Sequence, residues 1–337
     1  MGDTSEPEES KPSKPKGQGG AGRIERRSLA ESTLEIIRAG QYTVGDVDYD
    51  IRPQLSAMTS GTRYYAADSL LSQWKQPTAA SRFAREKATE ISIVEISTLQ
   101  GASDLSSVPY TSSEEPRRRV GVLNFASAKN PGGGFLSGAQ AQEESIARSS
   151  TLYPSLTSST GRKFYGPHNK DPKGGYYSHA MIFSPDVTVF RRDSGELIGP
   201  MEIDVVTSAA VNAGVARRTL HGQVAGEAEE VKIGKAMKER MGRILFLFEK
   251  HGIKDVVLGS FGTGVFQNKV SLVAAVWAEL LTAPGSRFAN SFDRVKFAIL
   301  GRSTFVEFKD AFEERQATRC DDDNAEQAQL ADAGECL

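Results

Sequence analysis

Two kinds of hydrophobic pattern alternate along the chain. In the first, apolar residues run almost without interruption and are rich in Val, Ile and Phe, which is typical of buried β-strands. These runs occupy residues 89–97, 120–127, 180–191, 203–211, 255–261 and 295–300. In the second, apolar residues recur every three or four positions, which predicts amphipathic helices over residues 28–40, 228–252, 269–283 and 303–315.

The alternation of strands with helices predicts the fold class. Near-continuous apolar strands are buried on both faces, so we expect an α/β architecture with a mainly parallel sheet that is covered by helices on both sides. Pro185 interrupts the segment 180–191 and predicts a bent pair of extended segments there. In sheets of this kind, ligands bind beyond the carboxyl ends of the strands. Functional residues are therefore expected in the loops that follow the strands.

The two ends of the chain differ in composition from its middle. Residues 1–23 have almost no apolar side chains and residues 316–337 are acidic, so both are expected to be disordered tails. Residues 24–315 are expected to form one domain, in which residues 24–115 are an N-terminal helical extension with the first strand. The basic residues near the N-terminus fit either a solvated tail or an address for the nucleus or a polyanion. They are Lys11, Lys14, Lys16, Arg23, Arg26 and Arg27.

Composition and charge exclude several classes of protein. The 337 residues carry a formal net charge of −2, which excludes a strongly basic nucleic-acid binder, and no sequence-specific nucleic-acid module is expected. No apolar run is long enough for a transmembrane helix, and the N-terminus has no apolar signal segment. Cys320 and Cys336 form no disulfide framework or zinc motif, and the four histidines show no ligand spacing. We expect an intracellular monomer of the nucleus or cytoplasm, without a metal or cofactor.

Two glycine-rich loops follow predicted strands. Residues 130–145 read NPGGGFLSGAQAQEES, and residues 259–268 read GSFGTGVFQN. Glycine lets backbone N–H groups turn towards a bound anion, and a helix N-terminus behind the loop adds a favourable dipole. Neither loop has the spacing of a triphosphate P-loop or of the dinucleotide fingerprint. Two such loops at one sheet edge indicate a diphosphate ligand, although a tight turn explains either loop alone equally well.

An amide and two carboxylates, Gln142, Glu143 and Glu144, close the first loop. Adjacent side chains diverge in any regular backbone, so the two glutamates are expected to have different tasks. A carboxylic acid whose pKa is raised by burial and by a neighbouring carboxylate can protonate the leaving oxygen of a glycosidic bond. The alternative is structural, because acidic residues at the start of a helix interact favourably with its dipole.

A longer pattern joins the three glycines to the acidic pair. Residues 132–144 read GGGFLSGAQAQEE, so a spacer of seven residues separates three glycines from Gln-Glu-Glu. This order and spacing resemble the signature of the bacterial, or microbial-type, poly(ADP-ribose) glycohydrolases. Later segments resemble further blocks of that family, and the similarity runs from about residue 24 to about residue 314. In one of these blocks Val211 lies where proline is expected, and the basic stretch at 162–175 has no assigned role.

The resemblance implies a fold and an activity. The fold would be a macrodomain, a three-layer α/β/α sandwich with a mixed, mainly parallel sheet that holds ADP-ribose at its edge, with an added N-terminal helical region. The activity would be cleavage of the ribose–ribose O-glycosidic bond of poly(ADP-ribose), with ADP-ribose as product and without a cofactor. ADP-ribosylated proteins would be its partners.

The resemblance also implies roles for individual residues. Glu144 would be the general acid and then the base for the incoming water, and Glu143 would hold the ribose hydroxyls. The N–H groups of the second loop would bind the diphosphate, and two apolar side chains beyond them would press on the proximal ribose. A Phe266 ring over that ribose would limit access to chain ends and favour exo-cleavage. The expected substrate-binding residues are Asn124, Asn130, Gly132, Gly133, Gly134, Gln142, Ser260, Gly262, Thr263, Gly264, Val265 and Phe266.

Two other functions stay open. A related hydrolase could act on a different ADP-ribose linkage, such as a mono-ADP-ribosylated protein or a free metabolite. A non-catalytic reader could bind ADP-ribose without cleaving it. The intact Gln-Glu-Glu argues against the reader, because a reader has no use for the acid, but it does not separate the two hydrolases.

Overall fold

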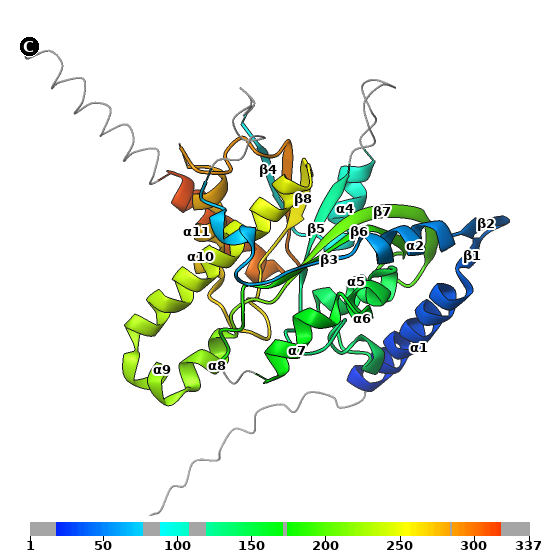
Figure 1. Cartoon of the computed structure of the whole chain (residues 1–337), viewed down its shortest axis with the longest axis horizontal. Coiled ribbons are helices and arrows are strands. Elements are labelled where there is room, and N and C mark those ends of the chain that lie inside the picture. The colour runs from blue at the N-terminus through cyan, green and yellow to red at the C-terminus, as the bar shows by residue number, and fades with distance from the viewer. Residues whose placement is uncertain (1–17, 77–87, 108–118, 171–173, 284, 318–337) are drawn as a thin grey trace, which may run out of the picture.

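The computed structural model describes residues 18–76, 88–107, 119–170, 174–283 and 285–317. A seven-stranded sheet forms the centre of this part of the chain (Figure 1). In spatial order its strands are β3 (Arg63–Tyr65), β6 (Met181–Arg191), β7 (Leu197–Ser208), β5 (Val120–Phe125), β8 (Asp255–Leu258), β9 (Arg294–Ala298) and β4 (Glu90–Val94). The four pairs from β7 to β4 are parallel, whereas β3–β6 and β6–β7 are antiparallel. The mixed, mainly parallel sheet is therefore confirmed.

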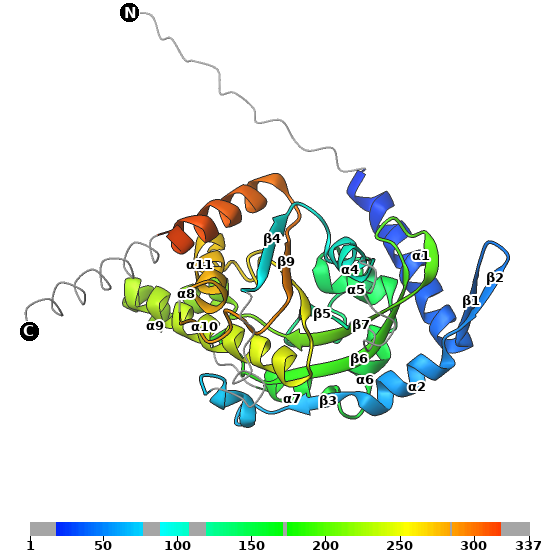
Figure 2. The ribbon, with the colours of Figure 1, turned by 90° about the horizontal axis from the view of Figure 1, so that it is seen from above.

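Helices cover both faces of this sheet, as Figure 2 shows from above. One face packs against α10 (Glu227–Lys250), α11 (Val270–Leu281) and the helix at 302–317. The other face packs against α2 (Arg52–Gly61), α4 (Thr98–Ser106), α5 (Gln142–Ser149), α6 (Leu152–Thr157) and α7 (Arg162–Lys170). Each interface is a separate hydrophobic cluster, so the molecule is the three-layer α/β/α sandwich that the sequence predicts.

The N-terminal region that precedes β4, which was predicted as a helical extension leading to the first strand, contains strands of its own. It consists of α1 (Gln18–Ala39), the hairpin β1 (Gln41–Val44) and β2 (Val47–Asp50), α2, strand β3 and the 3-10 helix η1 (Leu70–Gln73). β3 and β4 lie at opposite edges of the sheet, so this region also completes the sheet. Helix α1 already includes residues 18–23, which the composition assigned to the tail. Residues 1–17 and 318–337, on which the rest of both tail predictions rests, lie outside the described residues.

The segment around Pro185 also differs from the prediction. Instead of two extended segments, β6 is one long strand with a β-bulge between Ser184 and Val187. Asp186 in this bulge has a φ of 51°. A bulge releases one residue from the hydrogen-bond ladder, which lets proline lie inside a central strand. The strand therefore bends without ending.

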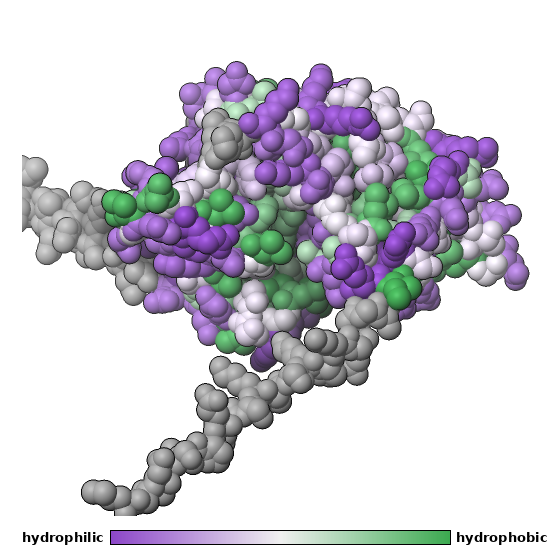
Figure 3. All heavy atoms as spheres, turned by 90° about the horizontal axis from the view of Figure 1, so that it is seen from below, coloured by the Kyte–Doolittle hydropathy of each residue, from purple (hydrophilic) through white to green (hydrophobic). Residues whose placement is uncertain are grey.

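The carboxyl ends of β5, β7 and β8 meet at one edge of the sheet, because these neighbouring strands are parallel. Short helices α8 (Ala213–Arg218) and α9 (Leu220–Ala225) follow β7 at this edge. Figure 3 views the molecule from this side and shows a hollow in which hydrophobic atoms gather. Within the described ranges, no helix is long and apolar enough to cross a membrane.

Candidate active site

Helix α5 carries the acidic pair in its first turn, next to the carboxyl end of β5. Gln142 fixes the helix to that strand with both ends of its amide. Its Nε2 donates to the Leu123 carbonyl oxygen at 2.7 Å, and its Oε1 accepts from the Phe125 N–H at 2.8 Å. Nε2 also lies 3.2 Å from Thr98 Oγ1. The sequence suggested Gln142 as a substrate ligand, but its amide binds the protein and thereby fixes the position of the two glutamates.

Glu143 points back into the protein. Its side chain is 2% exposed, its Oε2 accepts from the Ser127 N–H at 2.6 Å, and its Oε1 lies 3.4 Å from Asn124 Nδ2. Burial is the largest cause that shifts its pKa, and it outweighs the opposing hydrogen bond from Ser127; the neighbouring Glu144 carboxylate raises the pKa further, to about 8. Glu143 is therefore mainly protonated at neutral pH.

Glu144 diverges from Glu143 and meets the glycine loop. The Gly134 N–H donates to Glu144 Oε1 at 2.9 Å, and the residue is 9% exposed. The two adjacent carboxyl groups thus occupy different environments, as the sequence predicts for consecutive helical residues. Of the two, Glu144 is the slightly more exposed, at 9% against 2% for Glu143.

The shifted pKa of Glu143 predicts a pH dependence of stability. Between pH 4.5 and about 8 the folded chain holds a proton that the unfolded chain has released, so the free energy of unfolding falls as pH rises through this window. Glu143→Gln removes this contribution. Each pKa unit corresponds to about 1.4 kcal/mol. We therefore expect the free energy of unfolding of the variant, relative to that of the parent, to increase by a few kcal/mol from pH 5 to pH 8.5.

Urea unfolding of both proteins at pH 5 and pH 8.5 measures this gain. Other titrating groups are common to the two proteins and cancel in the comparison. A difference in stability that stays the same at both pH values would show that Glu143 is not protonated in the folded state.

The first loop needs consecutive glycines because its backbone lies very close to the two glutamate carboxyl groups. Gly132 and Gly133 have φ values of 69° and 58°, which side chains disfavour. A Cβ atom on Gly133 would lie 2.4 Å from Glu144 Oε1 and 3.1 Å from Glu143 Oε2. On Gly132 it would lie 2.9 Å from the ring of Phe135. Consecutive glycines thus let the backbone approach both carboxyl groups.

The N–H groups of this loop face acceptors of the protein itself. The Gly133 N–H donates to the Asn130 carbonyl oxygen at 2.9 Å, and the Gly134 N–H donates to Glu144. The Gly132 N–H interacts with the Glu143 carboxyl and lowers its pKa slightly against the effect of burial. The sequence suggested that this loop holds a diphosphate. In the structure these donors bind the protein's own acid pair and the turn that begins at the exposed Asn130.

The second glycine loop is tied to the end of β7. Gly262 has a φ of 75°, and a Cβ atom there would lie 2.3 Å from Ala210 Cβ. Asn268 Nδ2 donates to the carbonyl oxygens of Val211 and Gly262 at 2.7 and 2.9 Å. The Val211 N–H, which proline would lack, lies 3.4 Å from Met237 Sδ. These contacts place the loop at the same sheet edge as the acid pair.

The outer part of this loop is less enclosed. The Thr263 N–H and Oγ1 both donate to the Ser260 carbonyl oxygen, at 3.2 and 3.0 Å, so this donor of the predicted diphosphate site closes a turn. Gly264 is exposed, with no atom within 4 Å of a Cβ placed there. Val265 is 83% exposed, while Phe266 is half-buried and packs against both hydrophobic clusters.

Sequence reasoning missed the residues that orient the predicted ligand Asn124. This residue is fully buried, and its Nδ2 donates to Thr207 Oγ1 at 3.2 Å across the β5–β7 pair. Its Oδ1 has no hydrogen-bond partner among the described residues, and the same holds for Ser208 Oγ. Buried polar atoms without a partner are costly, so these two atoms are candidates for contact with a ligand or water. The polar Thr-Ser pair that ends the apolar strand β7 was the available signal.

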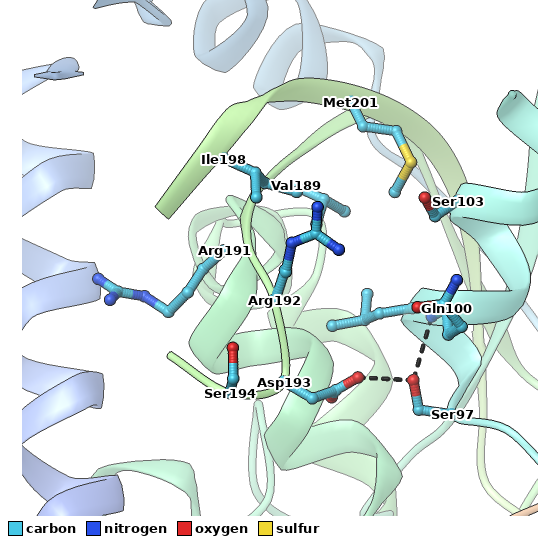
Figure 4. A pocket seen from close by; sticks show the side chains of 11 residues that line it. Ser97, Gln100, Ser103, Val189, Arg191, Arg192, Asp193, Ser194, Ile198 and Met201 are labelled. Atoms are coloured by element: carbon cyan, nitrogen blue, oxygen red, sulfur yellow. Dashed lines mark hydrogen bonds between the residues drawn. The ribbon is translucent and has the colours of Figure 1, made fainter. Parts of the chain in front are cut away.

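A cavity of about 260 Å³ lies between α4 and the β6–β7 hairpin (Figure 4). Asp193 on its wall accepts hydrogen bonds from Ser97 Oγ, which caps α4, and from Ser145 Oγ of helix α5. Leu99 and Val189 are among its apolar lining residues, and Arg192 also lines it. Asp193 thus connects the wall of this cavity to helix α5, which carries the acid pair, through its hydrogen bond with Ser145.

Taken together, a three-layer α/β/α sandwich with a pair of divergent glutamates at the carboxyl edge of its sheet defines a hydrolase of the macrodomain class. The family model described as "Microbial-type PARG, catalytic domain", where PARG stands for poly(ADP-ribose) glycohydrolase, matches residues 30–192. The comparison with curated proteins gave no match.

Solved structures extend the likeness over most of the chain. A poly(ADP-ribose) glycohydrolase from Thermomonospora curvata is 34% identical, covers 87% of this chain and 99% of its own, and superposes with a TM-score of 0.72. The same figures hold for that protein bound to the inhibitor ADP-HPD. A Deinococcus radiodurans poly(ADP-ribose) glycohydrolase in complex with ADP-ribose is 30% identical over 78% of this chain and 98% of its own, with a TM-score of 0.66. The chain therefore belongs to the microbial-type poly(ADP-ribose) glycohydrolase family, whose members are enzymes.

Proposed function

We propose that this chain hydrolyses the ribose–ribose O-glycosidic bonds of poly(ADP-ribose) and releases ADP-ribose. The observation that carries the proposal is the divergent acid pair, in which Glu143 is buried and the Glu144 carboxyl accepts from the Gly134 N–H. The catalytic unit would be residues 24–315, acting as a monomer on the polymer and on ADP-ribosylated proteins. The related proteins from Thermomonospora and Deinococcus bear the name of this activity.

Glu144 would serve as general acid and then as general base. Its carboxylate would first take up a proton from solvent. It then transfers this proton to the leaving ribose oxygen as the glycosidic bond breaks, and the sugar carbon gains oxocarbenium character. The carboxylate that remains accepts a proton from water, whose oxygen attacks that carbon and completes the hydrolysis. The Gly134 N–H, at 2.9 Å, stabilises this carboxylate between the two steps.

Glu143 and Asn124 would hold the hydroxyl groups of the reacting ribose. A protonated carboxyl offers both a donor and an acceptor, and Asn124 Oδ1 offers an acceptor that no described residue uses. Burial of both groups excludes water from them, which strengthens their bonds to a ligand. The diphosphate would then lie against the second loop, where Gly264 leaves its backbone open.

Phe266 is expected to cover the proximal ribose and so to select chain ends. Phe266→Ala should raise KM for the polymer by about tenfold, since the lost apolar contact is worth about 1–2 kcal/mol. It should also release oligomers from within long chains, because the ring no longer blocks the cleft. Steady-state kinetics and sizing of the products on a polymer of defined length measure both effects.

Val47→Ala, which removes a half-exposed side chain from the remote hairpin β1–β2, is the control and should leave KM unchanged. Unchanged KM and products for Phe266→Ala would remove Phe266 from the substrate site.

The experiment that tests the function offers the full chain three substrates: poly(ADP-ribose), a mono-ADP-ribosylated protein, and ADP-ribosylated small molecules. Release of ADP-ribose from the polymer, faster than from the others, is the expected result. Release from a single-unit substrate alone would assign the chain to another ADP-ribose linkage. Binding of ADP-ribose without release from any substrate would make it a reader.

A further inference from the structure

A row of aromatic side chains connects helix α7 to Phe266. The ring of Phe164 lies 4.7 Å from that of His168, His168 lies 5.5 Å from Tyr177, and Tyr177 lies 5.9 Å from Phe266. The first two rings are buried, whereas the last two are half-buried. The row thus runs from the core to the ring that is proposed to cover the substrate ribose.

Tyr177 has an unusual backbone conformation. Its φ of 51° lies in the left-handed region, which bulky residues rarely occupy. Such strain persists only when the surroundings impose it, and it concentrates at functional sites. The position therefore calls for a reason that involves the tyrosine ring itself, since glycine or asparagine would suit the backbone better.

Partly buried hydrogen bonds hold the backbone on both sides of Tyr177. Before Tyr177, the carbonyl oxygen of Tyr176 accepts from Arg240 Nη2 at 2.8 Å, and the Tyr176 hydroxyl donates to Glu229 Oε1 at 2.8 Å. After it, the Ser178 N–H donates to His168 Nε2 at 3.1 Å. Arg240 and Glu229 are both buried, so the flanking backbone is anchored to the core.

Phe266, by contrast, belongs to a largely exposed loop, although its half-buried ring packs against both hydrophobic clusters. Its neighbour Val265 is 83% exposed, and Gln267 on the other side has a φ of 56°. Its carbonyl oxygen accepts from the Gly214 N–H at 3.1 Å, which holds the backbone but not the ring. The nearest aromatic contact of the ring is Tyr177.

We propose that Tyr177 is a positioning residue that holds the ring of Phe266 against the proximal ribose, and that the core fixes Tyr177 for this purpose. The inference rests on the proposed function and deepens it. Tyr177 takes no part in a chemical step. It acts through Phe266, and the contact depends on its ring rather than on its hydroxyl.

Two variants of Tyr177 separate the ring from the backbone. Tyr177→Phe keeps the ring and should have the same KM as the parent. Tyr177→Asn removes the ring but tolerates the left-handed backbone, so its melting temperature should be at least that of the parent. Its KM for the polymer and its Kd for ADP-ribose should both rise about three- to tenfold, the size of one packed aromatic pair. kcat should change less than KM.

A double-mutant cycle with Phe266→Ala shows whether Tyr177 acts through that ring. On the Phe266→Ala background, Tyr177→Asn should have no further effect on KM or on Kd for ADP-ribose. Effects that multiply would overturn the inference, as would a loss of binding that merely follows a fall in melting temperature. If the intact chain binds ADP-ribose but releases none from the polymer, the proposed function fails, and the cycle on Kd still decides the role of Tyr177.

Discussion

Replacing Glu144 with glutamine should lower kcat for ADP-ribose release by about 10²–10⁴-fold, the range for loss of a general acid–base group. Glutamine keeps the size of the side chain and can still accept from the Gly134 N–H through its amide oxygen. It cannot donate a proton to the leaving oxygen or accept one from water. The Kd for ADP-ribose should therefore stay within about threefold of the parent, because a tenfold change would require about 1.4 kcal/mol of lost binding.

Rates on poly(ADP-ribose) and calorimetric binding of ADP-ribose, measured side by side, test this expectation. Glu227→Gln, an exposed glutamate at the start of α10, is the matched control and should behave as the parent. Glu143→Gln should change kcat little, since glutamine replaces a carboxyl that is already neutral at pH 7. Its main effect should be a higher KM, because Glu143 is proposed to bind the ribose hydroxyls. If Glu143→Gln abolishes kcat and Glu144→Gln does not, the two roles must be exchanged.

Gly133→Ala should lower kcat about 10²-fold or more, because displacement of a reacting group by about 1 Å has effects of this size. The added Cβ would lie 2.4 Å from Glu144 Oε1, so the carboxyl that we propose as the acid must move. Because alanine is strained at a φ of 58°, the substitution should also lower the free energy of unfolding by about 1–2 kcal/mol. Both effects follow from a single added methyl group.

Gly45→Ala separates the two effects. Gly45 has nearly the same φ, 59°, but lies in the β1–β2 turn with no atom within 4 Å of the new Cβ. This control should lose about the same backbone stability and keep its full kcat. Urea unfolding and steady-state kinetics of both variants make the comparison. Equal kcat values for the two variants would mean that the position of Glu144 does not depend on the glycine.

The strands and long helices could be predicted from the sequence because their pattern is local. The apolar run at 255–261 and the amphipathic stretch at 228–252 contain the signals for β8 and α10 within themselves. The bulge at Pro185 could not be predicted, because a proline can end a strand or be accommodated within it. The choice depends on the partner strand β7.

The sequence by itself determined the α/β class, the two glycine loops and the acid pair. Adjacent residues on a helix must diverge, so the sequence also predicts that Glu143 and Glu144 point in different directions. What only the tertiary structure decided is the environment of each carboxyl. Burial by the surrounding protein raises the pKa of Glu143 against the opposing hydrogen bond from the Ser127 N–H, while the Gly134 N–H binds Glu144. A pKa depends on which groups surround a carboxyl in space, and folding brings those groups together from separate parts of the chain.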